Sequence, residues 1–123
     1  MGIHRVAITG LGLISPFGGD AADFFDRLLA GESAVRYLQT DDLPRPLSTP
    51  FVTCPGFDPD AELGKPLALM MERFAQRGMA AAFRAWDQAG LPRQPEAGAD
   101  GARDDWACIW GTALGGVAAH ERG

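Results

Sequence analysis

A glycine-rich turn that follows a short apolar run near the N-terminus most constrains the fold of this chain. The run, residues 3–9, combines β-branched and apolar side chains and ends at Gly10, which is typical of a buried strand in a parallel sheet. The turn then passes through Pro16 to Asp20, a residue type that often caps the start of a helix. The sequence therefore predicts a strand, a sharp turn and a helix in succession.

Two helices are predicted from the spacing of apolar residues. The first occupies residues 20–31, and the second spans residues 66–89, with a proline in its first turn and Gly90 as a stop signal. Gly78 lies inside the second helix, where glycine costs roughly 0.5–1 kcal/mol relative to alanine. A close contact with a neighbouring helix or sheet at Gly78 is the expected reason for it.

The remaining segments complete an alternating order of strands and helices. Residues 32–64 carry five prolines and predict an irregular crossover with a short strand around residues 51–54. A polar, flexible loop is expected over residues 93–105, and the sequence WACIWG at 106–111 predicts a second buried strand. Another helix would open near Val117. This order indicates an α/β fold in which parallel central strands are joined by crossover helices.

Composition limits the possible partners and compartments. The net charge is −5 and Lys65 is the single lysine, so the chain lacks the cationic surface that nucleic acids require. No apolar run is long enough to span a membrane, so no membrane association is expected. Two cysteines without a CxxC or metal-ligand pattern are typical of a reduced, cytoplasmic protein.

The glycine-rich turn resembles only part of a dinucleotide-binding motif. Gly10 and Gly12 match its first two glycines, but Ser15 occupies the place of the third. Pro16 prevents a helix from starting inside the turn, so helical N–H groups would not face a pyrophosphate. A small nucleotide-binding domain of the Rossmann type is therefore disfavoured, and the glycines need another explanation.

The other candidate chemical groups form no recognisable constellation. Two cysteines and two histidines lack partners at the spacing that nucleophilic or acid–base catalysis needs: Cys54, Cys108, His4 and His120. Cys108 lies between two tryptophans and is expected to be packed in the second strand. Three arginines could form a basic strip on the second helix, although a solvated or ion-paired helix face is favoured: Arg73, Arg77 and Arg84.

Three segments in order resemble the β-ketoacyl synthases, the condensing enzymes of fatty-acid and polyketide synthesis in the thiolase-like superfamily. Residues 5–33 are similar to that family's opening strand, turn and helix, residues 71–91 to its M-D-R-F helix, and residues 110–116 to its I-G-T-G-x-G-G turn. The resemblance implies a layered thiolase-like fold, of which this chain is an incomplete N-terminal part. In this interpretation two sets of glycines turn the backbone or let it pass close to neighbouring layers: Gly10, Gly12 and Gly18, then Gly111, Gly115 and Gly116.

The resemblance also implies a reaction for the complete enzyme. A nucleophilic cysteine takes an acyl group as a thioester, malonyl on acyl carrier protein is decarboxylated, and the two are joined by Claisen condensation. The family's cysteine motif and both histidine motifs have no match in residues 1–123. No catalytic, cofactor-binding or metal-binding residue is therefore assigned, and no cofactor is expected. Acyl carrier protein is the implied partner, and the complete enzyme would be a homodimer.

Residues 1–123 are accordingly expected to be one N-terminal fragment of a β-ketoacyl synthase, an acyltransferase family, inactive on its own. The alternative is a non-catalytic module that docks onto, or completes, a full synthase or its carrier protein. Poor solubility is expected for the isolated chain, because its parallel strands would lack the neighbours that normally cover them.

Overall fold

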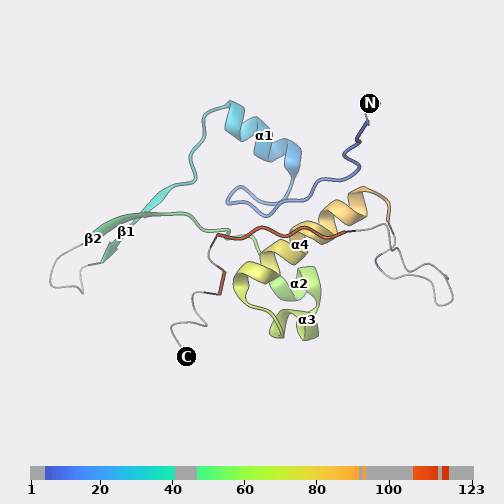
Figure 1. Cartoon of the computed structure of the whole chain (residues 1–123). Coiled ribbons are helices and arrows are strands. Elements are labelled where there is room, and N and C mark those ends of the chain that lie inside the picture. The colour runs from blue at the N-terminus through green and yellow to red at the C-terminus, as the bar shows by residue number, and fades with distance from the viewer. Residues whose placement is uncertain (1–4, 41–46, 92, 94–106, 114, 117–123) are drawn as a thin grey trace, which may run out of the picture.

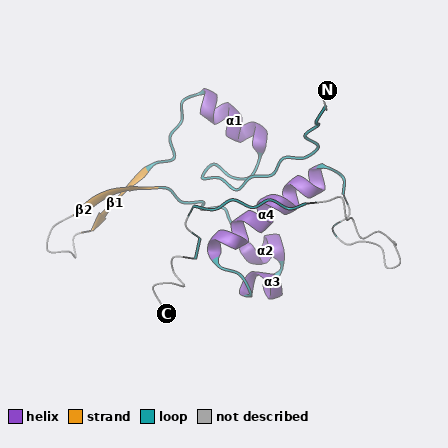
Figure 2. Cartoon of the chain, in the orientation of Figure 1, coloured by secondary structure: helices purple, strands orange, loops and turns teal. Residues whose placement is uncertain are grey.

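The computed structural model describes residues 5–40, 47–91, 93, 107–113 and 115–116. Helices and strands are mixed along the chain, as expected for a part of an α/β fold (Figures 1 and 2). The elements in chain order are α1 (Ala21–Leu29), β1 (Arg36–Thr40), β2 (Leu47–Phe51), α2 (Pro59–Leu63), α3 (Lys65–Leu69) and α4 (Arg73–Gln88).

The first predicted helix is confirmed as α1. The Asp20 side chain caps it by accepting a hydrogen bond from the backbone N–H of Asp23 at 2.8 Å. The helix ends before Gly31, which has a φ of +72° that favours glycine. Both ends of α1 are therefore set by local sequence, although the helix buries none of its residues.

The two predicted parallel strands are not formed in the described part of the chain. Residues 5–9 and 107–111 have no regular strand structure there, and their apolar side chains are exposed, with Val6 91% and Ile109 95% accessible. A parallel strand obtains its backbone hydrogen bonds from neighbours that are distant in the sequence. The composition of these stretches suits a buried strand, but the described residues supply no neighbouring strand to pair with them.

The sheet that is present lies inside the predicted irregular crossover. β1 and β2 form an antiparallel hairpin, with Tyr37 opposite Pro50. The sequence-based prediction of a short strand at 51–54 was thus misplaced, since β2 ends at Phe51. A sheet of two strands leaves one edge of each strand free, so Pro50, which has no N–H to donate, is tolerated in β2.

The second predicted helix is divided. α3 ends at Leu69, Glu72 adopts an extended conformation with ψ of 156°, and α4 begins at Arg73. The side-chain amide of Gln76 donates to the carbonyls of Ala68 and Met71 at 2.8 and 3.2 Å, so polar groups at the break are hydrogen-bonded. The predicted end of the helix is confirmed, because α4 stops before Gly90, where φ is +68°.

The small core lies where α2 and α3 join α4. Phe57, Ala68 and Ala80 are the buried apolar residues of the described part of the chain. The α2 helix packs against both α3 and α4 (Figure 1). Its own start is capped by Asp58, whose carboxylate accepts from the N–H of Asp60 at 3.0 Å. The predicted flexible loop at 93–105, apart from Arg93, and the helix expected near residue 117 lie outside the described residues.

Candidate functional site

The centre of the candidate site is the glycine-rich turn, which we define as residues 10–19. Ser15 and Gly18 exchange backbone hydrogen bonds of 2.9 and 3.1 Å, and the Ser15 hydroxyl donates to the Gly18 carbonyl at 2.7 Å. The same hydroxyl accepts from the N–H of Phe17 at 3.2 Å, and Ser15 is 7% exposed. Gly18 has a φ of +109°, which favours glycine there. Pro16 thus lies in a tight turn that is stabilised by hydrogen bonds between its own residues.

Gly10 and Gly12 serve close packing rather than the sharp turn that was expected of them. A Cβ added at Gly10 would lie 2.0 Å from the carbonyl oxygen of Ala85, and one at Gly12 would lie 2.0 Å from that of Ala81. Both carbonyls belong to α4. The backbone of the glycine-rich turn therefore approaches a helix at a distance that only glycine permits.

Side chains also join the turn to α4. Gln88 accepts a hydrogen bond from the N–H of Leu11 at 2.5 Å. Arg84 donates from Nη1 to the Leu13 carbonyl at 3.1 Å and forms an ion pair with Glu62 of α2. Nothing in the spacing of the sequence indicated these contacts, since they connect residues 77, 71 and 22 positions apart.

The nucleotide interpretation is further weakened by the start of α1. The Asp20 carboxylate already occupies the N-terminus of α1, and Asp23 adds a second carboxylate in its first turn. Both groups satisfy the partial positive charge that would otherwise attract a phosphate. Together with the packing of Gly10 and Gly12 on α4, this charge distribution disfavours a phosphate site at the turn.

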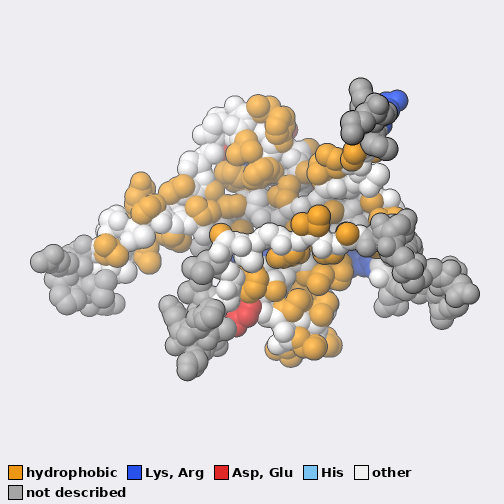
Figure 3. Space-filling model, in the orientation of Figure 1, with side chains coloured by type: hydrophobic (Ala, Val, Ile, Leu, Met, Phe, Trp, Pro, Cys, Tyr) orange, Lys and Arg blue, Asp and Glu red, His pale blue; other side chains and the backbone are white. Residues whose placement is uncertain are grey.

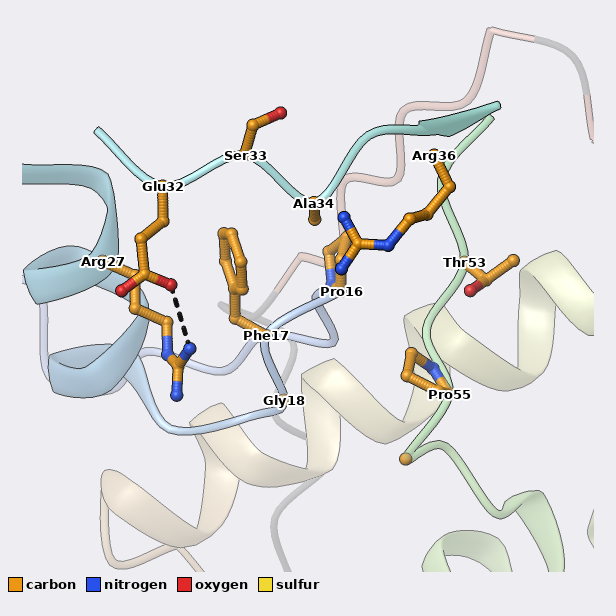
Figure 4. A pocket seen from close by; sticks show the side chains of 11 residues that line it. Pro16, Phe17, Gly18, Arg27, Glu32, Ser33, Ala34, Arg36, Thr53 and Pro55 are labelled. Atoms are coloured by element: carbon orange, nitrogen blue, oxygen red, sulfur yellow. Dashed lines mark hydrogen bonds and ion pairs between the residues drawn. The ribbon is translucent and has the colours of Figure 1, made fainter. Parts of the chain in front are cut away.

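A cavity of about 490 Å³ lies beside the turn (Figure 4). Arg27 and Arg36 line it together with the Phe17 ring, and Glu32 binds Arg27 at 3.1 Å. Asp23 and Glu32 raise the pKa of Arg27 by hydrogen bonding and opposite charge. The charge of Arg27 is thus compensated, and Arg36 is the second cation in the lining of the cavity.

A second, apolar groove of about 400 Å³ lies between the turn and residues 108–111. Its floor is the small-residue face of α4, and the Trp110 ring covers Gly78, where an added Cβ would lie 1.9 Å from the ring. A close contact at Gly78 is therefore present, but its partner is the Trp110 side chain in an irregular stretch rather than the predicted neighbouring helix or sheet. Gly115 likewise lies against Phe74, because a Cβ added at Gly115 would be 2.6 Å from the Phe74 ring. Gly111, by contrast, has open space around it.

The structure does not combine the candidate reactive residues. Cys54 is half-buried in the loop after β2, while Cys108 is exposed, so the prediction that Cys108 is packed in a strand was wrong. His4 and His120 lie outside the described residues. Within the described ranges, no group of three His, Cys, Asp or Glu side chains could hold a metal ion.

The three arginines of α4 have different surroundings. Arg73 lies over the Phe57 ring at 5.6 Å, and Arg84 is ion-paired with Glu62. Arg77 has a buried Nε for which the described residues supply no hydrogen-bond partner. The ion-paired interpretation is confirmed for Arg84, whose partner on α2 could not be identified from sequence spacing.

Comparison with known proteins agrees with the motifs in the sequence. Residues 4–122 match the family described as β-ketoacyl synthase, N-terminal domain. The chain is 35% identical over 92 residues to 3-oxoacyl-(acyl-carrier-protein) synthase 2 of Vibrio cholerae, which covers 74% of this chain and 22% of that protein. It is 33% identical over 121 residues to a polyketide β-ketoacyl synthase of Streptomyces halstedii, covering 96% of this chain and 27% of that protein.

A shorter match has a higher identity. Over 31 residues, the chain is 68% identical to the chloroplastic 3-oxoacyl-(acyl-carrier-protein) synthase I of Hordeum vulgare, which covers 25% of this chain and 7% of that protein. No solved structure matches the chain. In the described part of the chain, no helix has the length and apolar character needed to cross a membrane.

The chain covers only 22% of the Vibrio cholerae protein and 27% of the Streptomyces halstedii protein. The family match nevertheless extends over nearly all of this chain, from residue 4 to residue 122. The chain belongs to the β-ketoacyl synthase family, in the region of that family's N-terminal domain.

Proposed function

We propose that residues 1–123 are the N-terminal part of a condensing enzyme that joins an acyl thioester to malonyl-acyl carrier protein by decarboxylative Claisen condensation. The observation that carries this proposal is the family match over residues 4–122. Its relatives are named as 3-oxoacyl-(acyl-carrier-protein) synthases and as polyketide β-ketoacyl synthases, and the proposed reaction serves either fatty-acid or polyketide synthesis. The chain works in the cytoplasm and meets acyl carrier protein there, as a part of a complete, homodimeric enzyme.

In this proposal the described residues form a scaffold rather than a catalytic centre. The glycine-rich turn lies on α4, and the apolar groove over the small residues of α4 separates the turn from residues 108–111. Residues 5–9 and 107–111 become central parallel strands of a layered thiolase-like fold when the rest of the enzyme supplies their neighbours. Their exposed apolar side chains support this assignment, because such side chains are usually buried.

The second candidate is a non-catalytic module that docks onto a complete synthase or its carrier protein. The same exposed stretches favour it, since Ile8 is 82% and Ile109 95% accessible. Contiguous exposed apolar surface is a common mark of a protein interface. The two candidates differ in whether the chain supplies a required part of the enzyme or binds an enzyme that is already complete.

The first experiment asks whether the chain alone accepts an acyl group. Purified chain is incubated with radiolabelled acyl-acyl carrier protein, and covalent label is followed by mass spectrometry and by release with hydroxylamine. We expect no labelled chain, because neither Cys54 nor Cys108 lies in a matched nucleophile motif. A thioester that disappears in Cys54→Ala or Cys108→Ala alone would contradict this expectation.

A complementation experiment separates the two candidates. The chain is co-expressed with a relative's synthase that lacks the matching N-terminal region, and with the same synthase intact. If the chain restores condensation of malonyl-acyl carrier protein to the synthase that lacks its N-terminal region, the fragment is supported. If the chain binds the intact synthase and restores no activity to the shortened one, the docking module is supported. Ile8→Asp is the control variant, because a carboxylate within a central strand would prevent complementation. Reading the source DNA past codon 123 for cysteine and histidine motifs tests the fragment independently.

A further inference from the structure

Arg84 connects three parts of the chain through one guanidinium group. It extends from α4, donates from Nη1 to the Leu13 carbonyl at 3.1 Å, and donates from Nε to Glu62 Oε2 at 3.3 Å. Its Nη2 binds the other carboxylate oxygen of Glu62, so the pairing with α2 uses both oxygens. The Arg84 and Glu62 side chains are 31% and 25% exposed, so this contact is shielded from water more than a surface ion pair.

The Arg84 guanidinium lies directly against the backbone of Gly19. A Cβ added at Gly19 would lie 1.1 Å from Nη1 of Arg84. Gly19 does not have a positive φ, so its backbone conformation suits any residue. A side chain at position 19 would push the guanidinium away from Leu13 and Glu62. The space that glycine leaves there is occupied by Arg84.

We infer that Arg84 holds the glycine-rich turn in position on α4, and that the missing side chain at Gly19 leaves the room that the Arg84 guanidinium occupies. The Ser15–Gly18 hydrogen bonds shape the turn internally but do not attach it to a helix. Arg84 attaches the turn to α4 at Leu13, beside the hydrogen bond from Leu11 to Gln88, and Glu62 orients the guanidinium. Arg27 offers a contrast, because its ion pairs reach only Asp23 and Glu32, five residues away or fewer. The inference concerns this chain alone and does not depend on the proposed function.

The test is amide hydrogen exchange in the full chain, followed residue by residue by NMR. The reporters are the N–H groups of Ser15 and Gly18, which are hydrogen-bonded within the turn, and that of Gln76 in α4. In Arg84→Gln we expect exchange at Ser15 and Gly18 to rise about tenfold or more, since two hydrogen-bonded links to a charged group are lost. Exchange at Gln76 should change little. Arg73→Gln is the matched control on the same helix and should leave the turn unchanged.

Reversing the ion pair separates Arg84's two roles. The double variant Glu62→Arg, Arg84→Glu restores opposite charges between α2 and α4, but a carboxylate cannot donate a hydrogen bond to the Leu13 carbonyl. We expect the turn to stay as exposed to exchange as in Arg84→Gln. Recovery of protection at Ser15 in the reversed pair would overturn the inference, as would equal loss of protection at Ser15 and Gln76 in Arg84→Gln.

A double-mutant comparison tests the role of Gly19. Gly19→Ala should raise exchange at Ser15 about tenfold in the natural sequence and have almost no further effect in Arg84→Gln, because the guanidinium that it displaces is gone. Gly18→Ala is the control, since its strain comes from a φ of +109° and should appear equally in both backgrounds. If Gly19→Ala also acts equally in both backgrounds, Gly19 does not serve Arg84 and the inference is wrong.

Discussion

At the scale of single residues, glycines in this chain meet different physical requirements. Gly10 and Gly12 allow two stretches of backbone to approach within a distance that a Cβ would prevent. Gly18 has a φ of +109°, and a Cβ there would meet nothing within 4 Å. Gly78 is not in a turn and does not have a positive φ, but the Trp110 ring lies directly over it. The same residue type therefore has distinct roles that only its neighbours reveal.

Gly78→Ala should have opposite effects with and without Trp110. An alanine gains about 0.5–1 kcal/mol of helix stability over glycine, but its methyl group would overlap the Trp110 ring. We expect the local unfolding free energy of α4 to fall by about 1 kcal/mol or more in Gly78→Ala, as in other overpacked sites. In the Trp110→Ala background the same change should raise it. Amide exchange in α4 measures both, and the same sign in both backgrounds would refute the packing role.

At the scale of elements, the described helices begin and end where their local hydrogen bonds allow. Asp20 caps α1 and Asp58 caps α2. Helices are followed or separated by glycines that have a positive φ: Gly31, Gly64 and Gly90. These signals act over a few residues, so the sequence predicted the bounds of α1 closely. It did not predict the break between α3 and α4, because the side chain of Gln76 that binds the carbonyls there comes from the next helix.

Asp20→Ala should loosen the first turn of α1. The Asp20 carboxylate accepts from the N–H of Asp23 at 2.8 Å, and the loss of such a cap typically costs about 1 kcal/mol. We expect faster amide exchange at Asp23 and Phe24 and a lower helical signal by circular dichroism. Asp26→Ala is the matched control, because Asp26 is exposed in the same helix and does not cap it. Equal effects of both changes would argue against capping by Asp20.

The end of α4 carries a pH-dependent ion pair. Asp87 lies in the last turn, where a negative charge is unfavourable, and Arg93 donates to it from Nε at 2.8 Å. This hydrogen bond, together with the charge of Arg93, holds the pKa of the Asp87 carboxyl below its ordinary value of 3.8. The stabilisation is complete above about pH 3.8 and is lost as the pH falls through the lower pKa of the folded state.

An NMR titration of the Asp87 carboxyl carbon checks this sign. The midpoint should lie below 3.8 in the natural chain and move upward in Arg93→Gln, which removes the donor and its charge. Arg93 also lies over the Phe83 ring at 4.6 Å, so the Phe83 ring signals should shift in the same variant. An unchanged Asp87 midpoint in Arg93→Gln would show that Arg93 is not the cause.

At the scale of the whole molecule, the buried apolar side chains among the described residues lie at the junction of α2, α3 and α4. Apolar side chains remain exposed over many segments, as the space-filling view shows for one face (Figure 3). Val6, Ile8, Met70 and Ile109 are each more than 80% accessible. Cooperative unfolding requires a core that many elements share, and the described residues provide a small one.

The isolated chain should therefore melt without a sharp transition. We expect a broad, weakly cooperative calorimetric profile, binding of a hydrophobic dye, and self-association that grows with concentration in sedimentation velocity. Ile8→Asp with Ile109→Asp should reduce the self-association, while Glu32→Gln, an exposed polar change, should not. A monomer with a narrow melt would contradict this expectation and would support an independently folded module.

Features that depend on near neighbours along the chain could be predicted from the sequence alone. Asp20 and Gly31 define α1, Gly90 follows the end of α4, and the spacing of three motifs identified the family. Two features could be seen only in the folded chain: Arg84 binds Leu13 and Glu62, and residues 37 and 50 pair across a hairpin. Caps and turns are local hydrogen bonds and backbone angles, which a short stretch of residues specifies. Contacts between distant segments, by contrast, depend on how whole elements pack, and the pattern within any one element does not contain that information.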